Sequence, residues 1–445
     1  MSRRVVALGI AFLVLGSGSL ARAQAPAPQQ PPSPQAAPET PASPAERPAV
    51  LERLTFDEAV GRATSHNPTV AQAAQAILRA DALLAQARSV FYPFASGNIA
   101  TTVLDAARGF NGSVVQPKVQ TAFTATASYQ VLAAAGWAAK NQAADQAGIA
   151  RISAEETRRN VAISAAQAYL AVIAAERQVE IAVRNRDTAT ALEAYARTRL
   201  QAGQGSRLNY VRSVQQLATA ESLRQITELA VSRAEEALGV IVFANGPVGA
   251  NGEPAFAPTP PPADDSWLDA RPDVRVLRAQ LHAADRVVSD AWKNWLPTVT
   301  ASFAPSYVTP PGLFEPAKTW RAFFSLNVPI FDATLRPDKR VREADRETAR
   351  LQLDALTLEA RSEVRIARDS VRSNEAIVAS TREAAENAAE ALKITEIAYR
   401  AGATTNIEVV QAQQDARNNE IASAVAEDRL RQARLDLLVA LGQFP

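Results

Sequence analysis

The sequence contains no cysteine and only two histidines in its 445 residues. Disulfides, a lipid anchor attached to a cysteine and a Cys/His zinc site are therefore excluded. The histidines, His66 and His282, lie far apart, and no phosphate-binding glycine loop or nucleophile elbow is present. Most carboxylates alternate with arginines along helical segments, as on solvated faces. We therefore expect no catalytic residue, no metal, no cofactor and no enzymatic activity.

An excess of charge is also missing, because 47 basic residues face 46 acidic ones. No excess of positive charge therefore suggests nucleic acid as a partner. Glycine is scarce, with 18 residues, and aromatic residues make up only 6%. This composition favours long helices that pack through small side chains.

The first 23 residues are typical of a secretory signal peptide. Arg3 and Arg4 precede the apolar run Val5–Leu15, and Ala21-Arg22-Ala23 fits a cleavage site. A membrane anchor is the alternative, but this run is shorter than the roughly 20 residues needed to span a bilayer. Residues 24–50 are rich in proline and alanine and are expected to form a disordered tether.

The rest of the chain is an internal repeat, with copies at 51–243 and 266–442 and a linker at 244–265. Pro68 and Pro93 match Pro272 and Pro297, since 272 − 68 and 297 − 93 are both 204. Gly203 and Gly402 are 199 residues apart (402 − 203), so the first copy has five extra residues. We expect them in the loop 105–121, because exposed loops tolerate insertions.

Each copy is predicted to contain two strands, at about 95–104 and 122–131, and at about 298–308 and 320–329. Apolar and small polar residues alternate along them, as in outer-membrane β-barrel strands. A half-buried sheet in a soluble domain is the alternative. Aromatic residues near the strand ends favour the interpretation as membrane strands, because such residues lie at membrane–water interfaces. These residues are Trp292, Trp295, Trp320, Tyr92 and Phe331.

Four strands cannot close a barrel, and an open edge in lipid would leave backbone groups unpaired. The chain must therefore share a barrel with other copies. Two chains would give eight strands and a filled interior, whereas three would give twelve strands and a pore.

Two long helices follow each strand pair, at about 138–202 and 207–243 and at about 338–401 and 405–441. A run of about 65 residues would measure on the order of 97 Å, too long for a globular domain. Gly203 and Gly402 end the longest helices, so the two turns lie at one end of a helical tube. A coiled-coil seam is predicted along the second of these helices. It comprises Ala360, Val364, Ala367, Val371, Asn374, Val378, Thr381, Ala385, Ala388, Leu392, Thr395 and Tyr399.

The sequence resembles the TolC family of outer-membrane efflux and secretion channels from Leu54 to Gly442. The resemblance rests on the order of several motifs: "LTFDEAV" at 54–60, "RPDV" at 271–274, "VPIFD" at 328–332, the two tip glycines and "LLVALG" at 437–442. It implies a mainly α fold with a transmembrane β part. The resemblance implies that three chains build a twelve-stranded barrel in the outer membrane, continuous with a periplasmic α-helical barrel. It also implies passive export from an inner-membrane pump of the RND, ABC or MFS type, through a periplasmic adaptor (membrane fusion protein).

The resemblance further implies a periplasmic gate, which by position comprises Glu408, Gln411, Tyr399, Asn209 and Arg212. Gln411 and Asn209 stand where acids are usual, which indicates a less negative aperture. Asn209 is the expected partner of Tyr399, so their contact, the clasp between the two tips, should be weaker or uncharged. Glu408, repeated threefold, would form the main charged constriction, unless it is an ordinary solvated carboxylate.

The two turns are the expected adaptor-docking tips, although their small residues also suit ordinary helix capping. They comprise Ala202, Gly203, Gln204, Gly205 and Ser206, with Ala401, Gly402, Ala403, Thr404 and Thr405.

Two other classes of protein remain as alternatives. An exported coiled-coil structural or adhesin-like protein would explain the helices and the tether, but it would not need the four strands. A periplasmic adaptor would have one helical hairpin and not two equivalent halves. The sequence does not distinguish drug, metal, polysaccharide and protein cargo.

Overall fold

The computed structural model describes residues 51–257, 265–314 and 316–444. The predicted signal peptide, the predicted tether and part of the predicted linker lie outside these residues. The described chain is mainly helical with a smaller β part, which confirms the predicted fold class at that level.

The first half contains a strand pair followed by two long helices. Its elements are β1 (Glu52–Leu54), α1 (Phe56–His66), α2 (Pro68–Ser89), β2 (Phe94–Val103), β3 (Arg108–Phe110), β4 (Ser113–Gln116), β5 (Val119–Leu132), α3 (Ala134–Gln201), α4 (Arg207–Ile241) and β6 (Val248–Ala250). The predicted strand at 122–131 is thus part of a longer strand, and α3 begins four residues before the predicted start.

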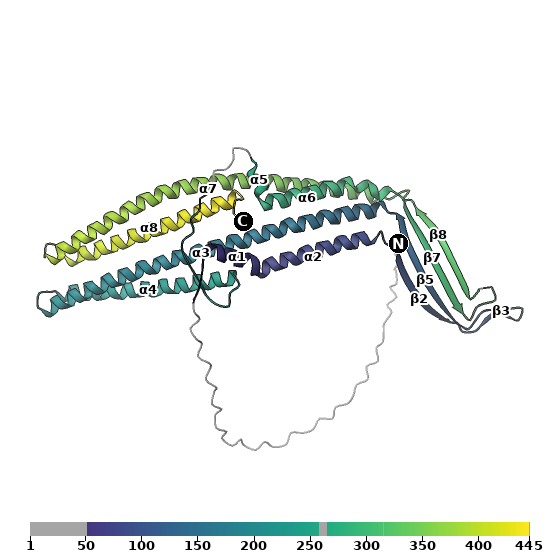
Figure 1. Ribbon diagram of the computed structural model, residues 1–445, viewed down its shortest axis with the longest axis horizontal. Helices are drawn as coiled ribbons and strands as arrows, with labels where there is room; N and C mark the ends of the chain where they lie inside the picture. The colour runs from purple at the N-terminus through teal and green to yellow at the C-terminus, as the bar shows by residue number, and fades with distance from the viewer. Residues whose placement is uncertain (1–50, 258–264, 315, 445) are drawn as a thin grey trace, which may run out of the picture. The chain divides into compact units, whose positions relative to one another are not determined.

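The second half has the same order of main elements. It contains α5 (Trp267–Ala270), α6 (Pro272–Ser289), a short 3₁₀ helix η1 (Ala291–Trp295), β7 (Thr298–Thr309), β8 (Lys318–Asn327), α7 (Leu335–Arg400) and α8 (Asn406–Ala440). Helices α3 and α7 have 68 and 66 residues, and α4 and α8 have 35 each. The sheet lies at one end of the long helices, and the turns α3–α4 and α7–α8 lie at the other (Figure 1).

Strands β2, β5, β7 and β8 form one antiparallel sheet in that order. Ile99, Phe123, Tyr307 and Lys318 lie opposite one another across it. Directly opposed residues share a face, and successive residues alternate between faces. One face is therefore apolar across all four strands, and the other is mostly small and polar. The apolar face includes Phe303, Trp320, Phe324 and Leu326, and the polar face includes Asn98, Thr124, Ser306 and Thr319.

The two outer strands of this sheet each have one neighbour among the described residues. Strand β2 pairs only with β5, and β8 pairs only with β7. Both outer edges consequently present backbone groups that could pair with another strand.

Two small sheets were not anticipated from the sequence. Strands β3 and β4 form a hairpin in the loop where we expected the five extra residues. Strand β6, within the predicted linker, pairs in parallel with β1, and Val248 and Ala250 are buried. Three residues are too few for a detectable period, and the surrounding glycine and asparagine residues hide this strand in the composition.

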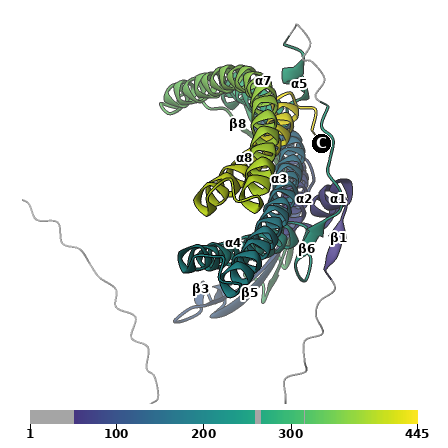
Figure 2. The ribbon, with the colours of Figure 1, turned by 90° about the vertical axis from the view of Figure 1, so that its left-hand side faces the viewer.

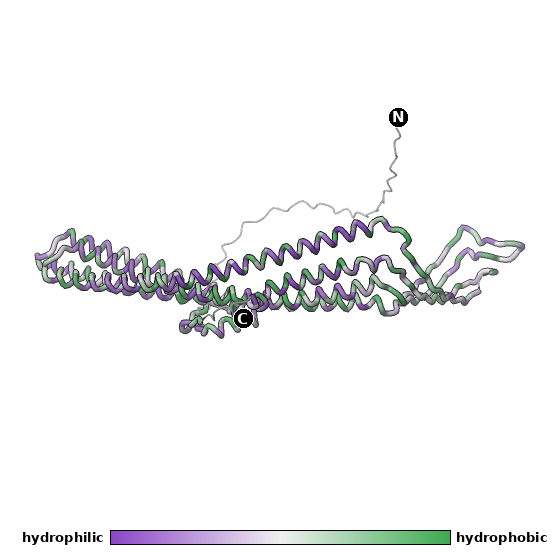
Figure 3. The backbone as a smooth tube through the Cα atoms, turned by 90° about the horizontal axis from the view of Figure 1, so that it is seen from above, coloured by the Kyte–Doolittle hydropathy of each residue, from purple (hydrophilic) through white to green (hydrophobic). Residues whose placement is uncertain are grey.

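The helices form a curved layer in which the two halves of the chain lie side by side (Figure 2). Helix α3 packs against α4 and α2 of its own half, and against α6 and α8 of the other half. Helix α7 packs against α8 and α6. The predicted seam along α7 is confirmed, because each of its residues from Ala360 to Tyr399 is buried or half-buried. Within the described residues, no helix is both long and apolar enough to cross a membrane, and polar residues recur along every long helix (Figure 3).

The long helices end in turns of one kind. Gly203 and Gly402 have φ of 68° and 74°. In the residues that follow, Gln204 N–H donates to the Arg199 carbonyl at 2.9 Å, and Ala403 N–H donates to the Ala398 carbonyl at 2.8 Å. This six-residue pattern is the Schellman motif, in which glycine tolerates the left-handed conformation.

The largest cluster of buried apolar residues lies midway along the helices and joins both halves. It contains Tyr169 of α3, Leu238 of α4 and Leu435 of α8. The Tyr169 hydroxyl donates to the Gly252 carbonyl at 2.9 Å and accepts from the Asn251 N–H at 3.1 Å. The segment after β6 is thus attached to the same cluster.

Candidate functional site

The end of the helices opposite the sheet is formed by the α3–α4 and α7–α8 turns. A cavity of about 460 Å³ lies between them. Asn209 and Arg212 of α4 line it together with Tyr399 of α7. The structure therefore brings together three of the five predicted gate residues, whereas Glu408 and Gln411 are exposed and do not line the cavity.

Tyr399 is buried and has a different partner from the one predicted. Its hydroxyl accepts a hydrogen bond from Asn406 Nδ2 at 3.4 Å, and its ring meets Tyr195 edge to face at 5.7 Å. Leu192 and Val409 complete a small cluster of buried side chains. Within the described part of this single chain, no hydrogen bond joins Tyr399 to Asn209. The clasp here joins α7 to the first turn of α8, which the sequence analysis did not foresee.

Glu408 lies in the first turn of α8, where a carboxylate is favoured by the helix dipole. Its carboxylate accepts hydrogen bonds from the hydroxyls of Thr404 and, at 3.3 Å, Thr405. It therefore stabilises the tip turn in addition to carrying an exposed charge. Gln411 lies one turn further along the same helix.

The predicted docking residues form the two turns themselves. Ala202, Gly203 and Gln204 are exposed, as are Ala401, Gly402 and Ala403. Gly205 is needed for another reason, because a Cβ there would lie 2.8 Å from the Leu200 backbone nitrogen. The first tip therefore requires two glycines, one for its φ and one for close approach.

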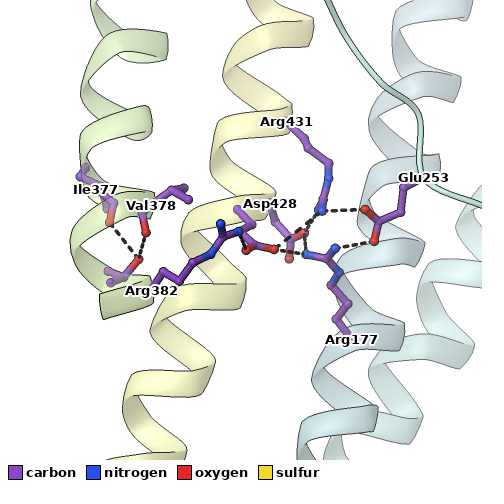
Figure 4. Close-up of polar contacts among 9 residues, drawn as sticks. Arg177, Glu253, Ile377, Val378, Arg382, Asp428 and Arg431 are labelled. Carbon is purple, nitrogen blue, oxygen red and sulfur yellow. Dashed lines mark hydrogen bonds and ion pairs between the residues drawn. The ribbon is translucent and has the colours of Figure 1, made fainter. Parts of the chain in front are cut away.

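An ion-pair network, which the sequence analysis missed, joins α3, α7 and α8 to the segment after β6 (Figure 4). Arg177 of α3 contacts Glu427 at 3.0 Å, Asp428 at 3.6 Å and also Glu253. These arginines and carboxylates were interpreted as solvated faces of single helices. Several of them instead meet between helices, where their spacing along one helix gives no signal.

Two further arginines complete this network. Arg431 contacts Asp428 at 2.6 Å and Glu253 at 2.8 Å, and Arg382 of α7 contacts Glu427 at 2.6 Å. The Arg382 hydrogen bond lowers the pKa of Glu427, although burial opposes it, and Arg177 lowers this pKa further. Burial raises the pKa of Asp428 in spite of its arginine partners.

We expect acid to weaken this network. The pKa of Glu427 lies below its ordinary value of 4.5, so ionised Glu427 contributes stability above the pKa of the unfolded chain. That contribution is lost as the pH falls through the lower folded pKa. The Arg382→Gln protein should therefore lose less apparent melting temperature than the wild type between about pH 6 and pH 3.5.

Circular dichroism during heating measures this difference. Arg372→Gln is the matched control, because its pair with Asp369 on the same helix is largely exposed. An acid dependence in Arg382→Gln equal to that of the wild type would contradict the assignment.

A second cluster forms around Arg271, the first residue of the "RPDV" motif. Its buried guanidinium donates to Asp273 at 2.6 Å and 3.1 Å, to Glu363 at 2.6 Å and to the Ala440 carbonyl at 3.2 Å. Burial raises the pKa of Asp273, but the hydrogen bonds and charge of Arg271 more than offset this and lower it. The motif thus attaches the start of α6 to α7 and the end of α8.

The five predicted interface aromatics are all exposed in the single chain. Tyr92, Trp292, Trp295 and Phe331 lie in the connections between the helices and the strands. Trp320 lies near the other end of the sheet, opposite Pro305. In the described residues, no cluster of three or more His, Asp or Glu side chains could hold a metal.

Comparison with known proteins agrees with this architecture. A family model described as "Outer membrane efflux protein" matches residues 265–443, the second copy. Residues 265–443 are thus similar to this family, in agreement with the resemblance to the TolC family.

Nodulation protein T of Rhizobium leguminosarum bv. viciae is 29% identical to this chain over 183 residues. That match covers 40% of this chain and 38% of the relative. Two solved structures share its fold over almost the whole described chain. VceC, an outer membrane protein of Vibrio cholerae, has a TM-score of 0.74 at 19% identity and covers 87% of this chain and 96% of its own. The CmeC outer membrane channel of Campylobacter jejuni has a TM-score of 0.76 at 15% identity and covers 87% and 85%.

Proposed function

We propose that three copies of this chain form an export duct across the outer membrane and periplasm. The sheet carries the argument, because a single apolar face covers all four strands and both edges are open. An apolar face suits lipid, and open edges must be paired within a membrane. Three chains would give twelve strands and leave an aqueous interior lined by the polar face, whereas two chains would leave no room for cargo.

The helices would continue this duct through the periplasm. Helices α3 and α7 reach about 100 Å from the sheet at 1.5 Å per residue. The tips would then meet a periplasmic adaptor and, through it, an inner-membrane pump that supplies the energy. The exposed small residues of both turns support this docking, because they let another helical hairpin approach closely.

Reconstitution tests the duct directly. The protein, purified from outer membranes in mild detergent, should have the native mass of a trimer and should give discrete conductance steps in a planar bilayer. A monomer that needs no detergent and never conducts would overturn the proposal. That result would favour an exported coiled-coil structural protein.

We further propose that Glu408, present three times, forms the charged constriction at the tips. Its hydrogen bonds to Thr404 and Thr405 complicate a simple alanine test. Glu408→Gln removes the charge but keeps an acceptor, whereas Glu408→Ala removes both. Both variants should conduct more than the wild type and lose most of its block by millimolar divalent cations.

Single-channel recordings with Mg²⁺ on the tip side make this comparison. If Glu408→Gln retains the wild-type block while Glu408→Ala alone changes conductance, the residue stabilises the turn and does not act through its charge. Exposed Glu390 of α7 provides a matched carboxylate away from the tips, and Glu390→Gln should behave like the wild type.

A further inference from the structure

The polar face of the sheet carries one charged residue. In the described strands β2, β5, β7 and β8, only Arg321 interrupts a face otherwise made of neutral side chains. Arg321 lies opposite Ala304 of β7, on the same face as the neighbouring pairs Ser306–Thr319 and Ser302–Phe323. It is exposed, and within the residues that the structure describes no hydrogen bond or ion pair holds its guanidinium. The positive charge of Arg321 can therefore interact with ions or solutes that reach the polar face.

The position of Arg321 in β8 determines on which face of the sheet its side chain lies. Lys318, three residues earlier, lies opposite Tyr307 on the apolar face, so the two cations point to opposite sides. An arginine in the middle of a lipid-facing strand is costly, whereas a lumen-facing one is tolerated. Arg321 is the fourth residue of β8, so it lies about 10 Å from the loop that connects β7 and β8.

We propose that Arg321, repeated threefold, makes the outer end of the duct selective for anions, so that it favours negatively charged cargo. This inference rests on the proposed trimeric duct. Three guanidinium groups would face one lumen with no carboxylate on the strands around them. Rings of basic side chains concentrate anions and repel cations in aqueous pores. The described residues of the adjoining loops have mixed charge, with Asp105, Arg108 and Lys118.

In our proposal the other end of the duct carries the opposite charge, because Glu408 lies at the tips. A charge at the tips could mask the outer ring in a whole-channel measurement. Selectivity is therefore best measured in the Glu408→Gln background, where the tip carboxylate no longer contributes.

The experiment is the reversal potential of reconstituted trimers in a tenfold KCl gradient. Arg321→Gln should lower the ratio of chloride to potassium permeability roughly twofold or more. Arg321→Lys should keep the ratio of the parent channel, because it keeps the charge. Lys318→Gln is the matched control, since it removes one positive charge from the same strand on the lipid face and should leave the ratio unchanged.

The outcomes separate this inference from the proposed function. If the trimers conduct but Arg321→Gln and Lys318→Gln have the same permeability ratio, the selectivity assignment is wrong and the duct stands. If the parent chain forms no conducting trimer, the duct itself is overturned. If Lys318→Gln alone changes the ratio, the two faces of the sheet have been exchanged.

Discussion

Replacing Arg271 by alanine is expected to lower the free energy of unfolding by about 3 kcal/mol, because partly buried carboxylates would be left without their cation. Arg271 is 6% exposed and bonds Asp273, Glu363 and the last turn of α8. The loss would separate α6 from α7 and α8. Thermal unfolding in detergent, followed by circular dichroism, should show a melting temperature several degrees below that of the wild type.

Arg278→Ala is the matched control for this experiment. Arg278 lies on the same helix and pairs with Asp269 at 2.5 Å, but both side chains are more than half exposed. A surface pair of this kind contributes less than about 1 kcal/mol. Equal effects of the two substitutions would show that the burial of Arg271 has no special role.

Gly239→Ala is expected to be the second strongly destabilising change, at about 2–3 kcal/mol. A Cβ at this position would lie 2.4 Å from the Gly246 carbonyl oxygen. Because that oxygen belongs to the backbone, either α4 or the segment leading to β6 must move. The corresponding position in the second copy is Leu438, since 438 − 239 is 199, so the close approach is specific to the first copy.

Gly148→Ala is expected to have the opposite effect on stability. Gly148 lies within α3, and nothing would contact a Cβ there. Alanine should therefore stabilise the helix by up to about 1 kcal/mol. Melting temperatures of the two variants should move in opposite directions, and a loss in both would mean that packing around α3 outweighs the helix propensity of alanine.

The sequence predicted most of the long elements because their signals are strong. A proline-free run of about 65 residues that ends at a glycine, as each of these two runs does, leaves little choice other than a long helix. Alternation along ten residues identified the four strands, and the structure adds the register that aligns their apolar faces. The short strand β6 was missed because three residues carry no detectable period.

The sites were harder to predict because they depend on contacts between helices. Tyr399 was singled out, but its bond to Asn406 follows from the geometry of one turn and not from the relation between the two copies. The ion pair of Arg177 with Glu427 joins residues 250 positions apart. No pattern along a single helix distinguishes such residues from a solvated face. The roles of the gate residues and of the tips therefore stay predictions.

The central pairing of β5 with β7 has a consequence for how the chain reaches its final form. These strands are neighbours in the sheet, yet their paired residues Thr121 and Thr309 are 188 positions apart (309 − 121), with α3, α4 and α6 between them. A two-stranded hairpin is marginal on its own, so β2 and β5 must wait for the second half of the chain before their sheet can form. Such long-range contacts slow folding and leave apolar strands exposed meanwhile. The late arrival of β7 makes the interval before the two halves pair the period in which this protein is most prone to aggregate.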